Sequence, residues 1–211
     1  KNRDGETTTL PDGTEVIAYD SKKGDFVWEK EVRPEYAWYD GRTRRMTISD
    51  KYANAGTEED PIILGEPVAT IEDMEAKIFP FKVMRGRQPA DTSRDLVTVP
   101  KLFGPGGFWG QIPPAEEYDP NTVLDIWTDA LTLGAQAAGQ IGSEESYVGY
   151  GEDWDWLYTE MYMGINHEVA PEDEALGCMD CHGNDAFDFE ALGYSCDPMT
   201  GGAEECGSRN P

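Results

Sequence analysis

The sequence predicts a loop-rich α+β fold in which a small antiparallel N-terminal sheet precedes a group of helices. Three observations support this prediction. Short aromatic-rich segments separated by turn residues run from 15 to 48, as in antiparallel strands. Apolar residues recur at helical spacing from 123 to 138. The 211 residues include 23 Gly and 14 Pro, and only 38% of them are hydrophobic, which indicates long irregular segments.

The predicted sheet consists of extended segments in the first 50 residues. They are residues 15–19, 26–28, 36–39 and 44–48. Asp40-Gly41 is a hairpin signal between the last two. Four aromatic residues lie in these segments, and they either pack a small core or line the edge of a bound group. They are Trp28, Tyr36, Trp38 and Tyr39.

A charged, irregular connection is expected after the sheet. Residues 50–70 are acidic apart from a short apolar run at 61–64. A basic cluster follows, and prolines at 80, 89 and 100 argue against a helix there. The cluster would pair with an anionic group, such as a cofactor carboxylate or a substrate, or with the chain's own carboxylates. It comprises Lys77, Lys82, Arg85, Arg87, Arg94 and Lys101.

Helices are expected in the last 90 residues. The first begins after Asp119 or Asn121 and ends at Gly139 or Gly142. Its small residues at 134–138 would let a flat partner approach closely, either a planar bound group or another helix. A second helix is expected over 152–163, a third from Pro171 into Cys178, and a short helical patch at 187–192.

These expectations divide the chain into three parts. Residues 1–70 form a β-rich aromatic subdomain. Residues 71–120 form an irregular basic connection rich in Pro and Gly. Residues 121–211 form a helical region that ends in a coiled tail.

The most specific motif is Cys178-Met179-Asp180-Cys181-His182. Two cysteines separated by two residues and followed by histidine form the attachment sequence for a c-type haem. The thiols become thioethers to one porphyrin edge, and His182 becomes the proximal ligand of the iron. We therefore expect the helices of the α+β fold to pack around a covalently bound haem c. A zinc site or a disulfide is the alternative, but zinc needs two further ligands at a matching spacing.

The two remaining cysteines, Cys196 and Cys206, lack that CxxC spacing. They are candidates for a disulfide that closes a C-terminal loop, since covalent haem attachment takes place outside the cytoplasm, where thiols are oxidised. A periplasmic or extracellular location is expected. A signal peptide should then have been removed, or the chain is a downstream piece of a longer polypeptide. No apolar run approaches the length of a membrane span.

The second histidine, His167, is the leading candidate for a distal haem ligand. It lies 11 residues before Cys178, in a bend between two expected helices. Imidazole is the best iron ligand that the chain still offers. Methionine is the alternative ligand, and four methionines are near in sequence. They are Met161, Met163, Met179 and Met199.

The net charge of −25 makes nucleic acids and anionic membrane surfaces poor partners. It is compatible with cationic partner proteins and with bound calcium, although no calcium loop of EF-hand type is present. No constellation of nucleophile and base, phosphate loop or dinucleotide motif stands out, so catalytic residues remain unknown.

Several runs of this sequence resemble the C-terminal part of the octahaem tetrathionate reductase family. They are Lys77 to Pro89 (KIFPFKVMRGRQP), Thr159 to Tyr162, Ile165 to Pro171 (INHEVAP) and Ala175 to His182. Approximately residues 24–200 are covered. The family consists of multihaem c-type cytochromes related in haem arrangement to hydroxylamine oxidoreductases and pentahaem nitrite reductases. The resemblance implies His182 as a proximal ligand and His167 as a distal ligand, to this haem or to a neighbouring one.

The family carries eight haem motifs, whereas this chain has one. The lysine that ligates the family's catalytic haem lies in a region absent here, and the tail with Cys196 and Cys206 has no match. The chain is therefore expected to be the C-terminal piece of a longer cytochrome, or a subunit whose partner chains hold the other haems.

The leading functional hypothesis is electron transfer through one covalent haem within an oligomer or multihaem assembly, with redox proteins as further partners. A second hypothesis is that the chain completes a reductase active site for a sulfur or nitrogen oxyanion, attracted by Lys82, Arg85 and Arg87. A third is a structural subunit of an extracellular cytochrome polymer.

Overall fold

The computed structural model describes residues 3–20, 24–25, 28, 32–114, 117–167 and 171–207. Two residues of the strand expected at 26–28 therefore lie outside the described residues. The strands are β1 (Thr7–Thr9), β2 (Glu15–Ile17), β3 (Tyr19–Asp20), β4 (Gly24–Asp25), β5 (Glu35–Tyr39), β6 (Thr43–Arg45), β7 (Ile62–Pro67), β8 (Lys77–Asp91), β9 (Leu96–Val97) and β10 (Trp154–Gly164). The helices are α1 (Pro120–Ala138), α2 (Cys178–Cys181) and α3 (Ala203–Cys206), with 3-10 turns η1 (Phe108–Gly110) and η3 (Glu172–Glu174).

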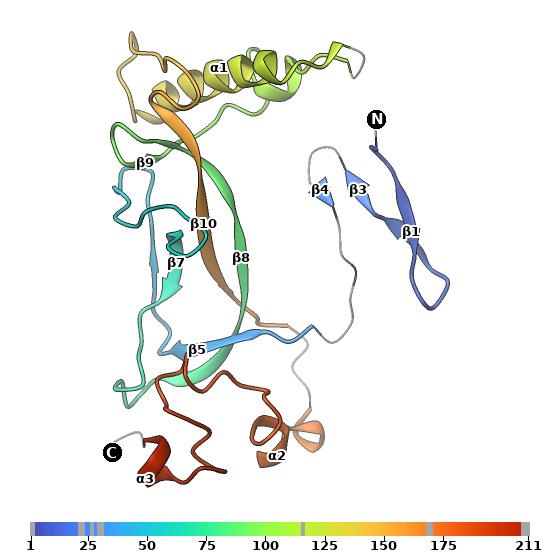
Figure 1. Cartoon of the computed structure of the whole chain (residues 1–211), viewed down its shortest axis with the longest axis vertical. Coiled ribbons are helices and arrows are strands. Elements are labelled where there is room, and N and C mark those ends of the chain that lie inside the picture. The colour runs from blue at the N-terminus through green and yellow to red at the C-terminus, as the bar shows by residue number, and fades with distance from the viewer. Residues whose placement is uncertain are drawn as a thin grey trace.

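The predicted α+β class is confirmed. The longest pair of strands is the antiparallel ribbon β8–β10, which runs through the main sheet (Figure 1). Its register runs from Trp154 opposite Asp91 to Gly164 opposite Phe81. The sheet has the order β5-β8-β10-β7-β6, with β9 added to the end of β8. All of its pairs are antiparallel except β10–β7, which is parallel.

The hairpin expected at Asp40-Gly41 is wrong. β5 pairs with β8, whereas β6 pairs with β7, so the two strands stand at opposite ends of the sheet order. Only residues 40–42 separate them, and such a link spans at most about 14 Å. The sheet must therefore curl until its two ends come near each other. The apolar start of β8 attracts β5, because Tyr39 packs against Phe79 and Phe81.

The helix expected over 152–163 is also wrong, since these residues lie largely in β10. The segment is rich in Trp and Tyr, which suit a pleated surface with partners on both edges better than a helix. A loop was expected over 50–70 and irregular chain over 71–120, but β7 lies within the first stretch and β8 within the second.

Pro89 fits into β8 because its backbone nitrogen and carbonyl point away from β10. The carbonyl of Pro89 accepts a hydrogen bond from Thr98 N at 2.9 Å, on the side away from β10. The ring nitrogen of Pro89 faces the same side, since N and O of one strand residue point in one direction. No hydrogen bond to β10 is lost, so a proline that argues against a helix is tolerated in this strand.

The predicted first helix is confirmed as α1, which lies across one end of the β8–β10 ribbon (Figure 1). Asp119 caps its start by accepting from Thr122 N at 3.0 Å, and Gly139 ends it with a φ of 73°. The partner of its small residues is neither a porphyrin nor a helix. A Cβ built on Gly134 would lie 2.0 Å from Val99 O, so an extended segment packs directly on the helix backbone.

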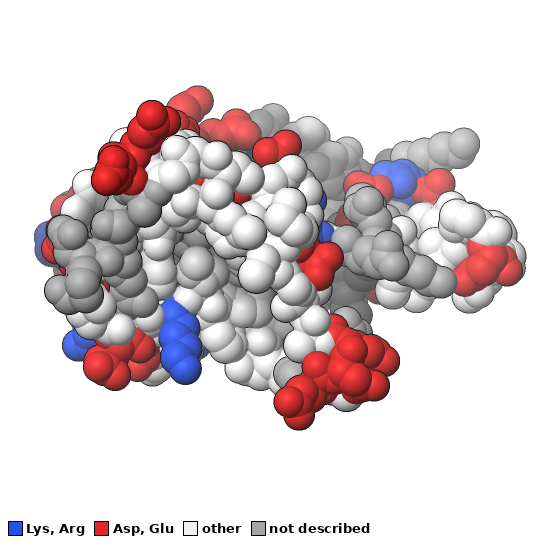
Figure 2. All heavy atoms as spheres, turned by 90° about the horizontal axis from the view of Figure 1, so that it is seen from below, with Lys and Arg blue, Asp and Glu red and all other residues white. Residues whose placement is uncertain are grey.

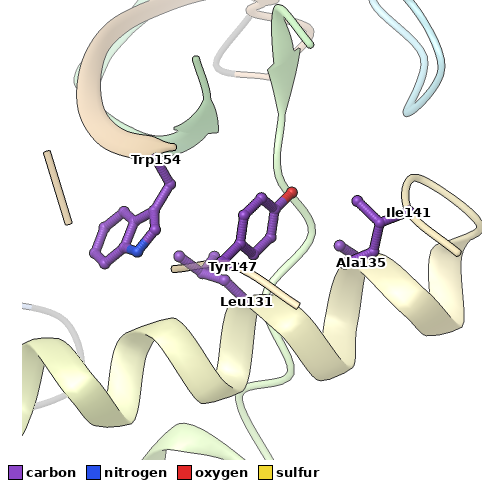
Figure 3. Close-up of a cluster of buried hydrophobic side chains, with 5 residues drawn as sticks. All are labelled: Leu131, Ala135, Ile141, Tyr147 and Trp154. Carbon is purple, nitrogen blue, oxygen red and sulfur yellow. The ribbon is translucent and has the colours of Figure 1, made fainter. Parts of the chain in front are cut away.

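A buried cluster joins α1 to the start of β10 (Figure 3). Beside it, Asp91 is fully buried and accepts from Tyr147 Oη at 3.1 Å and from Arg94 Nη1 at 3.0 Å. Burial opposes ionisation of Asp91, but hydrogen bonds from Ser93, Arg94 and Tyr147 outweigh it and lower the pKa below its usual value. The cluster is Leu131, Ala135, Ile141, Tyr147 and Trp154.

A second buried cluster ties the C-terminal residues to the opposite end of the sheet. Trp38 of β5 is 7% exposed, packs with Ala76 and Leu192, and donates from Nε1 to Leu192 O at 2.8 Å. Tyr36 packs edge-on against Phe187, with ring centroids 4.2 Å apart. Two of the four aromatic residues singled out in the sequence thus pack a core that anchors residues 187–192, which are turns and bends rather than the expected helical patch.

The expected third helix is reduced to two short pieces, η3 and α2. Ala175 lies between them in an extended conformation, with φ −62° and ψ 140°.

Figure 1 shows α2 and α3 beyond the end of the ribbon that is opposite α1. Seen from that end, acidic side chains form several separate groups and basic side chains are fewer (Figure 2). Within the described residues, no helix has the length and apolar character of a membrane span.

Candidate functional site

The site is built on the single helical turn of α2. Residues three apart on a helix share one face, so Cys178 and Cys181 present their thiols to the same side. The turn is closed at its start by Gly177 N, which donates to Asp180 Oδ2 at 2.7 Å. Neither cysteine is in a disulfide; Cys178 is exposed and Cys181 is partly buried. Burial, with smaller effects of Asp180 and Cys178, raises the pKa of the Cys181 thiol.

His182 leaves the helix in an extended conformation, with φ −109° and ψ 144°. Its Nδ1 lies 2.7 Å from Asp197 Oδ1, and its side chain is 25% exposed. An ionised carboxylate only accepts, so Nδ1 donates and Nε2 is left as the ring's other coordinating atom. Phe189 stacks on the imidazole with ring centroids 5.3 Å apart and planes 15° apart, which fixes the ring orientation.

Asp197 is held in place from both sides. It accepts from Gly183 N at 2.8 Å and from Met199 N at 2.9 Å in addition to His182. Desolvation opposes ionisation, but the hydrogen bond from His182 and those from the two amides prevail and lower the pKa of Asp197 to about 2. The carboxylate is therefore charged at neutral pH.

The predicted disulfide between Cys196 and Cys206 is confirmed, and it flanks Asp197 directly. Cys206 is fully buried, and its carbonyl accepts from Ser195 N at 3.0 Å. Gly201 N donates to Asp197 O at 2.9 Å, and a Cβ at Gly201 would lie 2.3 Å from Cys206 Sγ. Only glycine fits against this disulfide, which closes a tight loop around the aspartate.

Several apolar side chains around α2 are exposed. Leu176 is 70% exposed, Met179 61% and Met199 52%. A flat apolar group attached to the two thiols would cover such residues. With two thiols one turn apart, an adjacent imidazole that keeps Nε2 available, and an exposed apolar border, the residues present fit a covalently bound haem.

The structure places His167 in the segment after β10, and it is exposed. Among the described residues, it makes no hydrogen bond or ring contact with His182. The alternative ligands are divided: Met161 and Met163 lie in β10, whereas Met179 and Met199 lie beside the CxxCH turn.

The three arginines of the basic cluster at 77–101 contact other residues of the chain. Arg85 bonds to Glu35 at 2.6 Å and to Glu160 at 2.7 Å, and these carboxylates raise its pKa. Arg87 lies over the ring of Tyr158, 4.4 Å from its centroid. Arg94 bonds to Asp91 at 3.0 Å. No group of three or more His, Cys, Asp or Glu that could hold a metal ion occurs within the described residues.

Sequence reasoning missed two residues of the site, Asp197 and Phe189. Asp197 is one of 42 acidic residues, and its place next to Cys196 was the only available signal. Phe189 lies seven residues after His182, in a segment expected to be helical.

The fold and the site define a c-type cytochrome. The family described as "Cytochrome c bacterial" matches residues 1–185, and the chain belongs to this family, whose cofactor is covalent haem c. The fold is similar to the crystal structure of octaheme cytochrome c from Shewanella oneidensis, with a TM-score of 0.68 and 36% sequence identity. That likeness covers 92% of this chain and 40% of the octahaem chain, and it agrees with the multihaem resemblance of the sequence. No match was found among curated protein sequences.

Proposed function

We propose that this chain is an electron-transfer segment of a multihaem cytochrome, in which Cys178 and Cys181 carry one haem and His182 is its proximal ligand. The observation that carries the proposal is the His182 imidazole, oriented by Asp197 and Phe189 one residue beyond two thiols that share a helix face. Family membership supports haem-based electron transfer in general.

The chain's residues account for attachment and orientation. Bound at the two thiols, haem supplies one-electron oxidation and reduction of iron. Asp197 holds the Nδ1 proton of His182, which leaves Nε2 without a proton, and this nitrogen would ligate the haem iron. The exposed apolar side chains of Leu176, Met179 and Met199 would pack against a haem held at these thiols and would keep water from it.

His167 is the proposed distal ligand, of this haem or of a neighbouring haem. Its exposure and its place just beyond the end of β10 leave the imidazole accessible to a group outside the sheet. The chain covers only 40% of the octahaem cytochrome it resembles and has one CxxCH motif. We therefore propose that further haems come from other segments or partner chains, in a periplasmic or extracellular assembly.

Electron transfer is favoured over an oxyanion-reducing site on this chain. The oxyanion hypothesis depended on Lys82, Arg85 and Arg87. Arg85 is paired with Glu35 and Glu160, and Arg87 donates to Tyr158 Oη at 2.9 Å. The two carboxylates offset the charge of Arg85, so this arginine offers little attraction to a substrate anion, whereas the phenol of Tyr158 is neutral and leaves the charge of Arg87 in place.

The test is the intact mass and visible spectrum of the chain purified from a host with cytochrome c maturation. We expect the mass of the chain plus one haem, and no covalent haem in a Cys178→Ala/Cys181→Ala variant. Cys196→Ser/Cys206→Ser is the matched control, because it removes two cysteines and should keep the haem. Covalent haem in the Cys178/Cys181 variant, or none in the unmodified chain, would contradict the proposal.

The role of His167 is tested separately with His167→Ala. If it ligates the haem of the same chain, the ferric spectrum changes from low spin to high spin. If it ligates a neighbouring haem, the isolated chain is unaffected and the change appears only in the assembly. A low-spin spectrum of the variant in both settings would refute the assignment and leave a methionine as the ligand to test next.

A further inference from the structure

The C-terminal tail brings a carboxylate to the back of the proposed haem ligand. Asp197 Oδ1 lies 2.7 Å from His182 Nδ1, within the range of a charge-assisted hydrogen bond. Both side chains are largely shielded from water, at 15% exposed for Asp197 and 25% for His182. A hydrogen bond between a histidine and a charged carboxylate makes the imidazole a stronger donor to a metal on its other nitrogen.

The carboxylate is positioned by covalent and hydrogen-bonded constraints. The Cys196–Cys206 disulfide begins one residue before Asp197, and Gly201 N binds Asp197 O at 2.9 Å. Met199 N donates to the same oxygen as His182 at 2.9 Å, and Gly183 N donates to the other oxygen of the carboxylate at 2.8 Å. Asp197 therefore has no freedom to turn away from His182, and the loop acts as a rigid holder.

We propose that Asp197, held by the Cys196–Cys206 loop, is a positioning residue for His182 that strengthens the imidazole as an iron ligand and lowers the reduction potential of the haem. The inference rests on the proposed function, because it takes His182 as the ligand. Ferric haem carries one more positive charge than ferrous haem. A negative charge transmitted through the imidazole stabilises the ferric state more, and one-electron reduction becomes less favourable.

The experiment compares the midpoint potentials of the haem-loaded chain and two variants by spectroelectrochemistry. Asp197→Asn keeps the size and an acceptor oxygen but removes the charge. Asp185→Asn removes the same charge three residues beyond His182, at an exposed position whose φ of 57° asparagine tolerates. We expect Asp197→Asn to favour reduction at least tenfold, which is 59 mV for one electron. Asp185→Asn should move the potential much less.

A second measurement needs no variant. In the wild-type ferric protein, the Nδ1 proton of His182 should give a hyperfine-shifted NMR signal that exchanges slowly with water, because Asp197 retains it. Equal potentials in Asp197→Asn and Asp185→Asn, or rapid exchange of the Nδ1 proton, would overturn this inference while the haem stays attached. A chain without covalent haem at Cys178 and Cys181 would overturn the proposed function itself, so the two failures are distinguishable.

Discussion

The close approach of α1 to the segment 99–101 gives a sharp stability prediction for Gly134→Ala. A Cβ at residue 134 would lie 2.0 Å from Val99 O and 2.6 Å from Lys101 N. Both atoms belong to backbone that cannot rotate away. The helix and the segment must therefore separate by about 1 Å, a gap that forfeits a quarter to a half of the dispersion attraction across it.

The magnitude follows from three contributions. Overpacking of this kind costs about 1–3 kcal/mol. The hydrogen bond from Lys101 N to Ala130 O, at 2.9 Å, would be stretched beyond use, at about 1 kcal/mol. Alanine offsets about 1 kcal/mol, because it is the better helix former. We expect Gly134→Ala to lower the free energy of unfolding by about 2 kcal/mol.

Urea unfolding followed by circular dichroism measures this change. Gly86→Ala is the matched control, since a Cβ there meets nothing within 4 Å, and it should change the free energy of unfolding by less than about 1 kcal/mol. If Gly134→Ala proves as stable as the wild type, the helix does not rest on the backbone of residues 99–101, and the account of the small-residue face is wrong.

Three further outcomes are expected. Leu131→Ala, which empties part of the cluster at the start of β10, should lower the free energy of unfolding by about 2–5 kcal/mol in the same assay. Cys196→Ser/Cys206→Ser should destabilise the protein by about 3 kcal/mol, as expected for a cross-link with a sequence separation of 10, whereas an unchanged melting temperature would show that the loop is held by other contacts. The lowered pKa of Asp91 stabilises the folded state at pH values above the unfolded pKa of about 4, and this stabilisation is lost as the pH falls toward the folded pKa. Acidification should therefore destabilise the wild type more than Asp91→Asn, and parallel pH profiles of unfolding would contradict the role of Asp91.

Local features of the structure could be predicted from the sequence where they depend on residues that are close together in the chain. The CxxCH turn, the Asp119 cap and the Gly139 end of α1 depend on residues within a few positions of each other. The disulfide was also predictable, because the two remaining cysteines had only each other to pair with. Long-range pairing was not readable. Trp154 to Gly164 carries apolar residues that fit helical and extended spacing alike, and the partner β8 lies more than 60 residues earlier.

The sequence by itself thus determined the class of cofactor and the residues expected to bind it, because the motif for covalent haem attachment consists of five consecutive residues. Only the tertiary structure decided that β5 pairs with β8 while β6 pairs with β7, at opposite ends of the strand order in a curled sheet. It alone showed that Arg85 is already neutralised by Glu35 and Glu160. It alone brought Asp197 to His182, because a contact across 15 residues depends on how a disulfide-closed loop folds back.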